Sequence, residues 1–148
     1  MKKFLILFSV FSFSLTVAAC VPSRVDEDKK LMQACQESVK AVADAADQFD
    51  FKKSSFKSGK GQAGVDLRIV SLTAVVIHDH GAEMEETPTC SYKEEWGLMN
   101  YRAEFYNLER NGAQYGNFDG HALGDPAALV KITEANDKVL SAEESPFF

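Results

Sequence analysis

Two histidines, His78 and His80, are the side chains whose type and spacing come closest to a metal site. Residues two apart at the end of a strand point to the same face, so both imidazoles could bind one Zn²⁺ or Cu²⁺ ion. Further ligands could come from three acidic residues and the third histidine, namely Glu83, Glu85, Glu86 and His121. The glutamates fall in an acidic segment that we expect to be a solvated loop. Metal binding is therefore the alternative function, and we expect no resident cofactor.

Glutamates are frequent between residues 83 and 95, which raises the question of acid–base catalysis. Paired carboxylates catalyse only where a cleft holds them at a defined separation and shifts their pKa values. Clustered surface glutamates do not indicate such a cleft. The sequence also has no Gly-x-Ser-x-Gly motif of the kind that carries a nucleophilic serine. We expect no enzyme activity.

Aromatic side chains gather between residues 92 and 118, and most of them are expected to belong to the core. Strand alternation places Tyr101 and Phe105 on one face and Tyr106 on the other. Exposed aromatic residues with an arginine are typical anchors of protein interfaces. The candidate residues for binding a partner protein are Trp96, Tyr101, Arg102, Tyr106 and Tyr115.

The N-terminus has the three-part layout of a secretory signal. Lys2 and Lys3 precede an apolar run of about 14 residues, which is shorter than the roughly 20 residues of a bilayer-spanning helix. The segment Val17-Ala18-Ala19-Cys20 resembles the lipobox of bacterial lipoproteins. This resemblance implies that residues 1–19 are removed, that the Cys20 sulfur is diacylated and that the new N-terminus is usually acylated as well. The alternative is an ordinary cleaved signal with a chance cysteine.

The same resemblance implies a location in the cell envelope. Two or three acyl chains hold a protein firmly on a membrane, because each buried methylene contributes about 0.8 kcal/mol. Val21 follows the cysteine, whereas an aspartate there tends to retain such proteins in the inner membrane. We therefore expect an outer-membrane anchor with the protein facing the periplasm. No later segment is apolar for long enough to span a bilayer.

Size and charge limit the classes of partner. Removal of residues 1–19 takes away two lysines and no acid, so the formal net charge changes from −6 to −8. An acidic chain without a basic stripe argues against nucleic acid and against surface binding to anionic lipid. We expect a lipidated tether over 20–25 and a single globular domain over 26–148.

With Cys20 carrying lipid, Cys35 and Cys90 remain as an even pair in an oxidising compartment, which predicts a disulfide. A catalytic or redox cysteine is the alternative, but no Cys-x-x-Cys spacing is present. The bridge would connect a helix that begins near Ser23 or Asp26 to the middle of a sheet. Apolar residues at helical spacing mark that helix: Leu31, Cys35, Val39, Val42, Ala46 and Phe49.

Downstream of this helix the pattern is mainly that of strands. We expect a Ser/Gly/Lys-rich loop over 52–64, strands over 65–77, 89–96 and 99–108, and loops over 78–88 and 119–124. Asn111-Gly112 predicts a hairpin turn that places Leu108 opposite Tyr115. Asp125 and Pro126 predict the start of a short helix followed by a strand, although 129–140 could instead be a hairpin turning at Asn136-Asp137.

These elements predict an α+β fold in which an N-terminal amphipathic helix packs on a mainly antiparallel sheet. The arrangement broadly resembles cystatin-like folds, in architecture only. For function we expect a non-enzymatic outer-membrane lipoprotein that binds another envelope protein, as an assembly, inhibitor, immunity or exclusion factor. The alternative is a periplasmic metal-binding lipoprotein that uses His78 and His80.

Overall fold

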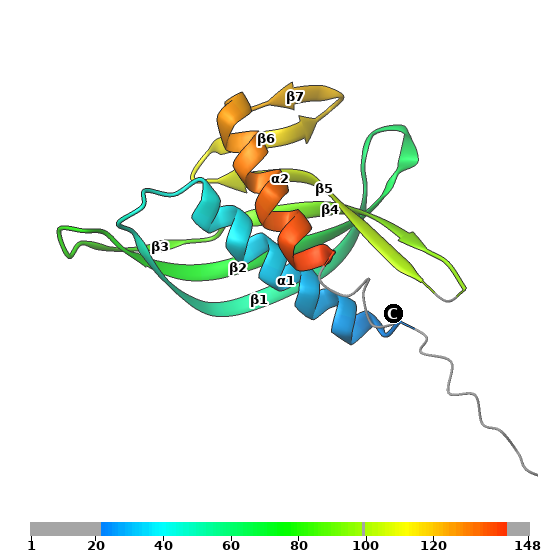
Figure 1. Cartoon of the computed structure of the whole chain (residues 1–148), viewed down its shortest axis with the longest axis horizontal. Helices are drawn as coiled ribbons and strands as arrows, with labels where there is room; N and C mark the ends of the chain where they lie inside the picture. The colour runs from blue at the N-terminus through cyan, green and yellow to red at the C-terminus, as the bar shows by residue number, and fades with distance from the viewer. Residues whose placement is uncertain (1–21, 99, 142–148) are drawn as a thin grey trace, which may run out of the picture.

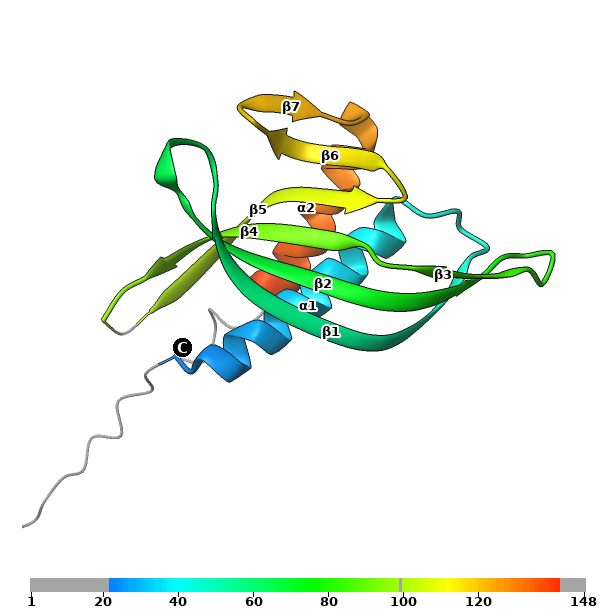
Figure 2. The ribbon, with the colours of Figure 1, turned by 180° about the vertical axis from the view of Figure 1, so that it is seen from behind.

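The computed structural model describes residues 22–98 and 100–141, which form an antiparallel sheet with both helices on one face (Figures 1 and 2). The elements in chain order are α1 (Arg24–Ala41), β1 (Gln48–Lys60), the 3-10 turn η1 (Gln62–Gly64), β2 (Asp66–Ile77), β3 (Glu83–Glu86), β4 (Thr89–Trp96), β5 (Tyr101–Arg110), β6 (Ala113–Phe118), β7 (His121–Leu123) and α2 (Pro126–Leu140). The sheet order is β1-β2-β4-β5-β6-β7, and β3 pairs with β2. The expected α+β class with a mainly antiparallel sheet is confirmed.

Helix α1 begins at a capped N-terminus and ends earlier than its apolar pattern suggests. The Ser23 hydroxyl accepts a hydrogen bond from the Asp26 backbone N–H, and two acidic residues occupy the first turn. Leu31, Cys35 and Val39 are fully buried. The helix ends at Ala41, so the prediction that its stripe continues to Phe49 is wrong. Phe49 lies in β1.

The predicted loop over 52–64 is also wrong, because β1 runs to Lys60. Phe49, Phe51 and Phe56 all pack against the core, although the last two are five residues apart. A register shift between Phe51 and Lys53 absorbs the odd residue, so Phe51 pairs with Ala74 and Phe56 with Val70 on the same face. The bulge hides the alternation that identifies a strand in the sequence.

The hairpin and the second helix test the remaining predictions. Asn111 and Gly112 have φ values of 51° and 79°, and Leu108 pairs with Tyr115, so the predicted turn is confirmed. The Asp125 carboxylate caps α2 by accepting from the Ala128 N–H. However, α2 is one continuous helix to Leu140, so both the helix-then-strand and the hairpin alternatives are wrong. Short strands β3 and β7 likewise replace parts of the two predicted loops.

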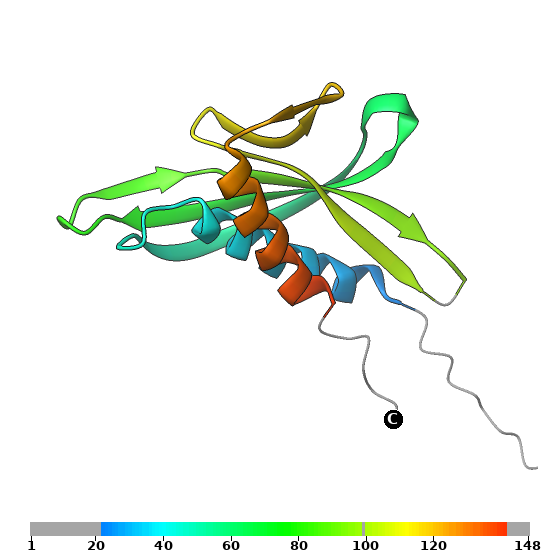
Figure 3. The ribbon, with the colours of Figure 1, turned by 45° about the horizontal axis from the view of Figure 1, so that its top comes forward.

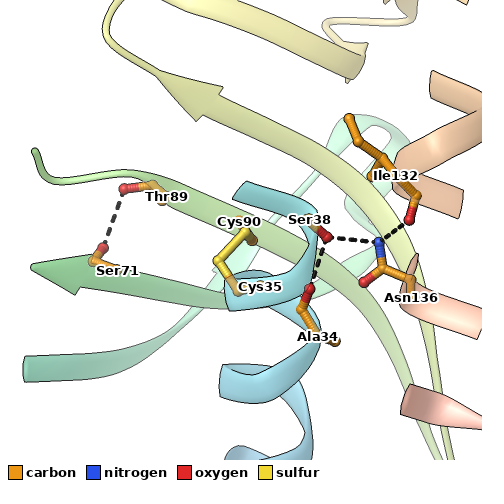
Figure 4. The surroundings of a disulfide bond; sticks show 8 residues. All are labelled: Ala34, Cys35, Ser38, Ser71, Thr89, Cys90, Ile132 and Asn136. Carbon is orange, nitrogen blue, oxygen red and sulfur yellow. Dashed lines mark hydrogen bonds between the residues drawn. A yellow bond between two sulfur atoms is a disulfide. The ribbon is translucent and has the colours of Figure 1, made fainter. Parts of the chain in front are cut away.

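The predicted disulfide is confirmed, and it lies in the centre of the core (Figure 4). Cys35 of α1 and Cys90 of β4 are fully buried, with an S–S distance of 2.00 Å and a Cα–Cα distance of 5.7 Å. Beside the bridge, Ser38 Oγ donates to the Ala34 carbonyl and accepts from Asn136 Nδ2, each at 2.8 Å. The bridge therefore ties α1 to the sheet, and the adjacent bonds tie α1 to α2.

A second buried contact joins β3 to the β5–β6 turn. Arg110 donates to both oxygens of Glu86 at 2.7 and 3.0 Å, and Asn111 Nδ2 donates to the same carboxylate at 2.7 Å. Glu86 is 3% exposed, and its burial raises its pKa, but the hydrogen bonds from Arg110 and Asn111 outweigh burial and lower the pKa overall. The ionised carboxylate therefore stabilises the folded state.

Removal of the disulfide is predicted to destabilise the fold strongly. The bridge closes a sequence separation of 55 residues, for which chain entropy gives a stabilisation of roughly 4 kcal/mol. We expect a Cys35→Ser, Cys90→Ser double variant to lose about that much free energy of unfolding in a urea titration. The free energy of unfolding of the wild-type chain in strong reductant should match that of the variant. An unchanged midpoint under reducing conditions would contradict the prediction.

Glu86→Gln is predicted to cost on the order of 2 kcal/mol at neutral pH, because a charge-assisted contact with Arg110 is lost. The native pKa of Glu86 is lowered, so this contribution is fully present above the unfolded pKa of about 4.3. It is lost as the pH falls through the native pKa. Urea unfolding at neutral and acidic pH should therefore show the two proteins converging in acid. Glu85→Gln changes an exposed neighbour and is the control. A difference in unfolding free energy between wild type and Glu86→Gln that did not change with pH would refute the role of the ionised carboxylate.

Candidate partner-binding site

Part of strand β5 has a backbone edge without a neighbouring strand. On one side β4 pairs with β5 along its length, from Tyr101 opposite Trp96 to Glu109 opposite Thr89. On the other side β6 pairs only with Asn107–Arg110. Within the described part of the chain, residues 101–106 thus form an unpaired edge. Figure 3 shows the β4–β5 hairpin projecting beyond the helices while β6 and β7 turn away.

Gly116 explains why the β5–β6 ladder stops where it does. Its φ of 100° is a conformation that L side chains rarely adopt. A Cβ at this position would also lie 2.5 Å from the Tyr106 carbonyl oxygen and 2.9 Å from the Asn107 Cα. Gly116 pairs with Asn107 at the end of the ladder, and β6 then continues to pair with β7. The close approach of β6 to β5 at this point therefore requires glycine, and residues 101–106 beyond it have no partner in β6.

Ladder geometry determines which backbone groups point outward from the unpaired edge. The Gly97 N–H donates to the Asn100 carbonyl at 2.8 Å and closes the β4–β5 turn. Hydrogen-bonded and non-hydrogen-bonded pairs alternate along an antiparallel ladder. Counting from this turn, the N–H and C=O groups of Tyr101, Ala103 and Phe105 point away from β4. An extended peptide could pair with all three residues.

A groove of about 1000 Å³ opens beside this edge. Its walls are β5, the N-terminal turns of α1 and the C-terminal half of α2. Tyr101, Phe105 and Leu140 contribute apolar surface, while five carboxylate and three basic side chains, two of them from β4, line it together with neutral residues. The groove is therefore amphipathic, with a small excess of negative charge.

The floor of the groove holds a buried polar group with an unused acceptor. Asn136 is 2% exposed, and its Nδ2 donates to Ser38 Oγ and to the Ile132 carbonyl, both at 2.8 Å (Figure 4). Its Oδ1 has no hydrogen-bond partner among the described residues. Buried acceptors normally have a donor. Oδ1 is itself inaccessible from outside, and the buried Tyr92 hydroxyl also has no partner among the described residues.

The hairpin is held against the start of α1 by an aromatic and ionic cluster. Arg24 donates to both oxygens of Glu94 at 2.5 and 3.2 Å, and its guanidinium lies 4.5 Å from the Trp96 ring centroid. The Tyr101 hydroxyl donates to Glu94 at 3.3 Å. Burial, reinforced by the charge of Glu94, raises the pKa of Tyr101, and the hydrogen bond to Glu94 raises the pKa of Arg24. These contacts fix the unpaired edge relative to α1.

The five predicted partner-binding residues do not form one surface. Trp96 and Tyr101 are adjacent, with ring centroids 4.6 Å apart, on the face covered by the helices. Tyr115 shares that face but lies opposite Leu108, farther along the sheet. Arg102 alternates to the other face, and the Tyr106 hydroxyl accepts from the Gln62 N–H at the β1–β2 connection. The division of Tyr101 and Tyr106 between two faces follows the strand alternation, and a role of these five residues in binding a partner stays a prediction.

Sequence reasoning missed Ala103, Phe105 and Asn136 as site residues. The alternation of Tyr101, Ala103 and Phe105 was visible as one strand face. The sequence did not indicate that β6 would stop pairing before these residues, and its only sign of this was the glycine at position 116. Asn136 enters the sequence analysis only through the alternative of a hairpin turning at Asn136-Asp137. Its burial depends on contact with Ser38, which is distant in the sequence.

The histidines do not converge on a metal site in the described residues. His78 Nδ1 hydrogen-bonds to Asp47 Oδ1 at 2.8 Å, and His80 Nδ1 to Asp79 Oδ1 at 3.0 Å. The two rings stack with centroids 5.6 Å apart. His121 begins β7, at the opposite edge of the sheet from β1. Residues 22–98 and 100–141 contain no group of three or more His, Cys, Asp or Glu side chains that could hold a metal ion.

Cys20 and the lipobox-like segment lie outside the described residues. Across the part of the chain that is described, no helix has the length and apolar character needed to cross a bilayer. In comparisons with known proteins, no family model matches this sequence, and neither a curated protein nor a solved structure matches it.

Proposed function

We propose that the mature chain begins at an acylated Cys20, is anchored in the outer membrane facing the periplasm, and acts by binding another envelope protein without catalysing a reaction. The lipobox-like Val17-Ala18-Ala19-Cys20 supports the anchor. The buried disulfide between Cys35 and Cys90 fits an oxidising compartment such as the periplasm.

The observation that carries the binding role is the unpaired edge of β5 beside the groove. An extended segment of a partner can add to such an edge as a further strand, so that main-chain hydrogen bonds provide affinity and side-chain pockets provide specificity. Tyr101, Ala103 and Phe105 offer the main-chain groups, and the groove offers the pocket. The acidic excess of the groove favours a segment that carries basic side chains.

The edge of the sheet formed by β1 is less suited to this role. Strand β1 carries four exposed lysines along its 13 residues, namely Lys52, Lys53, Lys57 and Lys60. Lysines on an edge strand discourage pairing with another strand. The contrast with β1 supports β5 as the docking edge.

Assembly factors, inhibitors, immunity proteins and exclusion factors can all work by binding of this kind. The arrangement of α1 against an antiparallel sheet is the feature for which we compare the domain to cystatin-like folds. The comparison concerns architecture and transfers no residue role.

The anchor predicts a defined mass for the protein isolated from native membranes. Intact mass spectrometry should show a polypeptide that begins at Cys20 and carries two or three acyl chains. A Cys20→Ala variant should lack these chains, since its lipid attachment site is gone. An unmodified polypeptide, or one that still begins at Met1, would refute the anchor.

Strand addition predicts that the outward N–H of Ala103 is needed for partner binding. A photo-crosslinking residue at position 104 should capture a partner in the native envelope, and Ala103→Pro should reduce that product about tenfold, because proline removes one hydrogen bond and obstructs pairing. Ala103→Ser keeps the N–H and should retain the product. The same crosslinker at position 57, on β1, is the control for the opposite edge.

Circular dichroism and the thermal midpoint should first show that Ala103→Pro is folded, which is expected because proline is tolerated where an edge N–H faces outward. If the folded proline variant gave as much product as wild type, or if position 57 captured the same partner, the β5 edge would not be the docking site.

A further inference from the structure

Three large apolar side chains are exposed at the end of the molecule where the described chain begins. Leu98 in the β4–β5 turn is 96% exposed, Val25 in the first turn of α1 is 65% exposed, and Trp96 at the end of β4 is 42% exposed. We call these residues the apolar tip. The start of α1 lies beside the end of the β4–β5 hairpin (Figures 1 and 3). Arg24, stacked on Trp96 and bonded to Glu94, joins the two elements.

The apolar tip is necessarily close to Cys20. Only four residue steps separate Cys20 from Arg24, and an extended chain spans at most about 3.6 Å per residue, so the Cα atoms are at most about 14 Å apart. Since the Arg24 guanidinium lies 4.5 Å from the Trp96 ring centroid, Trp96 and the neighbouring Val25 share this limit to within about one side-chain length, and Leu98 follows Trp96 by only two residues. If Cys20 is inserted in a membrane by its acyl chains, the tip lies at the membrane surface.

We infer that the apolar tip is a second membrane contact, in which Leu98 and Val25 enter the lipid interface and Trp96 sits at the level of the headgroups. This inference rests on the proposed acyl anchor but is independent of the protein partner. Tryptophan favours membrane interfaces because its ring is apolar and its N–H is polar. A leucine at the end of a turn gains most from lipid, since water surrounds it almost completely in the free protein.

Charge argues that this contact is apolar and does not depend on anionic lipid. The net charge without residues 1–19 is −8, which opposes approach to a negative surface. The Arg24 cation is already paired with Glu94. The apolar tip should therefore bind zwitterionic vesicles as well as it binds vesicles that contain anionic lipid. A protein partner at the tip would have to fit into the same short interval between the domain and the lipid anchor.

Within residues 22–98 and 100–141, the other exposed large apolar residues lie elsewhere and provide controls. Met84 is in β3, Leu123 is in β7, and Val130, which is 57% exposed, is in α2. Val130 is comparable in exposure to Val25 but belongs to a different element. A charge at Val130 should not affect a contact made by the tip.

Fluorescence can test the inference directly, because Trp96 is the only tryptophan in the sequence. The full-length chain, purified from native membranes in detergent, would be reconstituted into phosphatidylethanolamine vesicles that contain phospholipids brominated on their acyl chains. We expect the Trp96 emission to shift to shorter wavelength and to lose about half its intensity, as for a tryptophan at the interface. Leu98→Asp should abolish most of this quenching, and Val130→Asp should leave it unchanged.

Several results would overturn the inference. Trp96 could remain unquenched by brominated lipid and open to aqueous acrylamide, or quenching could require phosphatidylglycerol. A blue shift that needs added envelope protein would instead assign the tip to a protein partner. Intact mass of the same sample distinguishes a failure of the acyl anchor from a failure of the membrane contact. An acylated chain with unquenched Trp96 refutes the membrane contact alone, whereas an unacylated chain refutes the anchor and with it the membrane contact.

Discussion

The buried link between Cys35 and Cys90 is the constraint on which the rest of the structure depends. It fastens α1 to β4, which lies inside the sheet rather than at its edge. Because both helices cover one face only, α1 must be held in place for α2 to pack beside it through Ser38 and Asn136. The walls of the groove are these same helices and β5. A shift of α1 would therefore change the groove as well as the core.

Sequence patterns were informative where local chemistry determines the backbone. The Asn111-Gly112 turn, the Asp125 cap and the strand Thr89–Trp96 follow from turn propensity, capping and alternation. Sequence patterns failed where contacts between residues distant in the sequence determine the backbone. The bulge after Phe51 places Phe56 back on the core face, and a serine- and lysine-rich segment thus becomes an edge strand. Asn136 stays helical because its amide is used by Ser38 and Ile132.

The candidate site was less predictable than the fold, for a related reason. An edge that is left unpaired is a property of where a neighbouring strand ends, and here Gly116 sets that end through its positive φ and its close approach to β5. Alternation along β5 predicted the division of Tyr101 and Tyr106 between two faces, but it did not indicate which backbone groups would be left without a neighbouring strand. Histidines close in sequence each hydrogen-bond to a different aspartate, so spacing alone did not indicate their surroundings.

The lysines of β1 have a consequence for self-association. The open edge of this 13-residue strand is long enough to pair with the same edge of a second copy. Such a pair would bring the lysine-rich strands of both copies to the spacing of neighbouring strands, about 4.8 Å. Electrostatic self-repulsion would then oppose the pairing, and high ionic strength would weaken that protection.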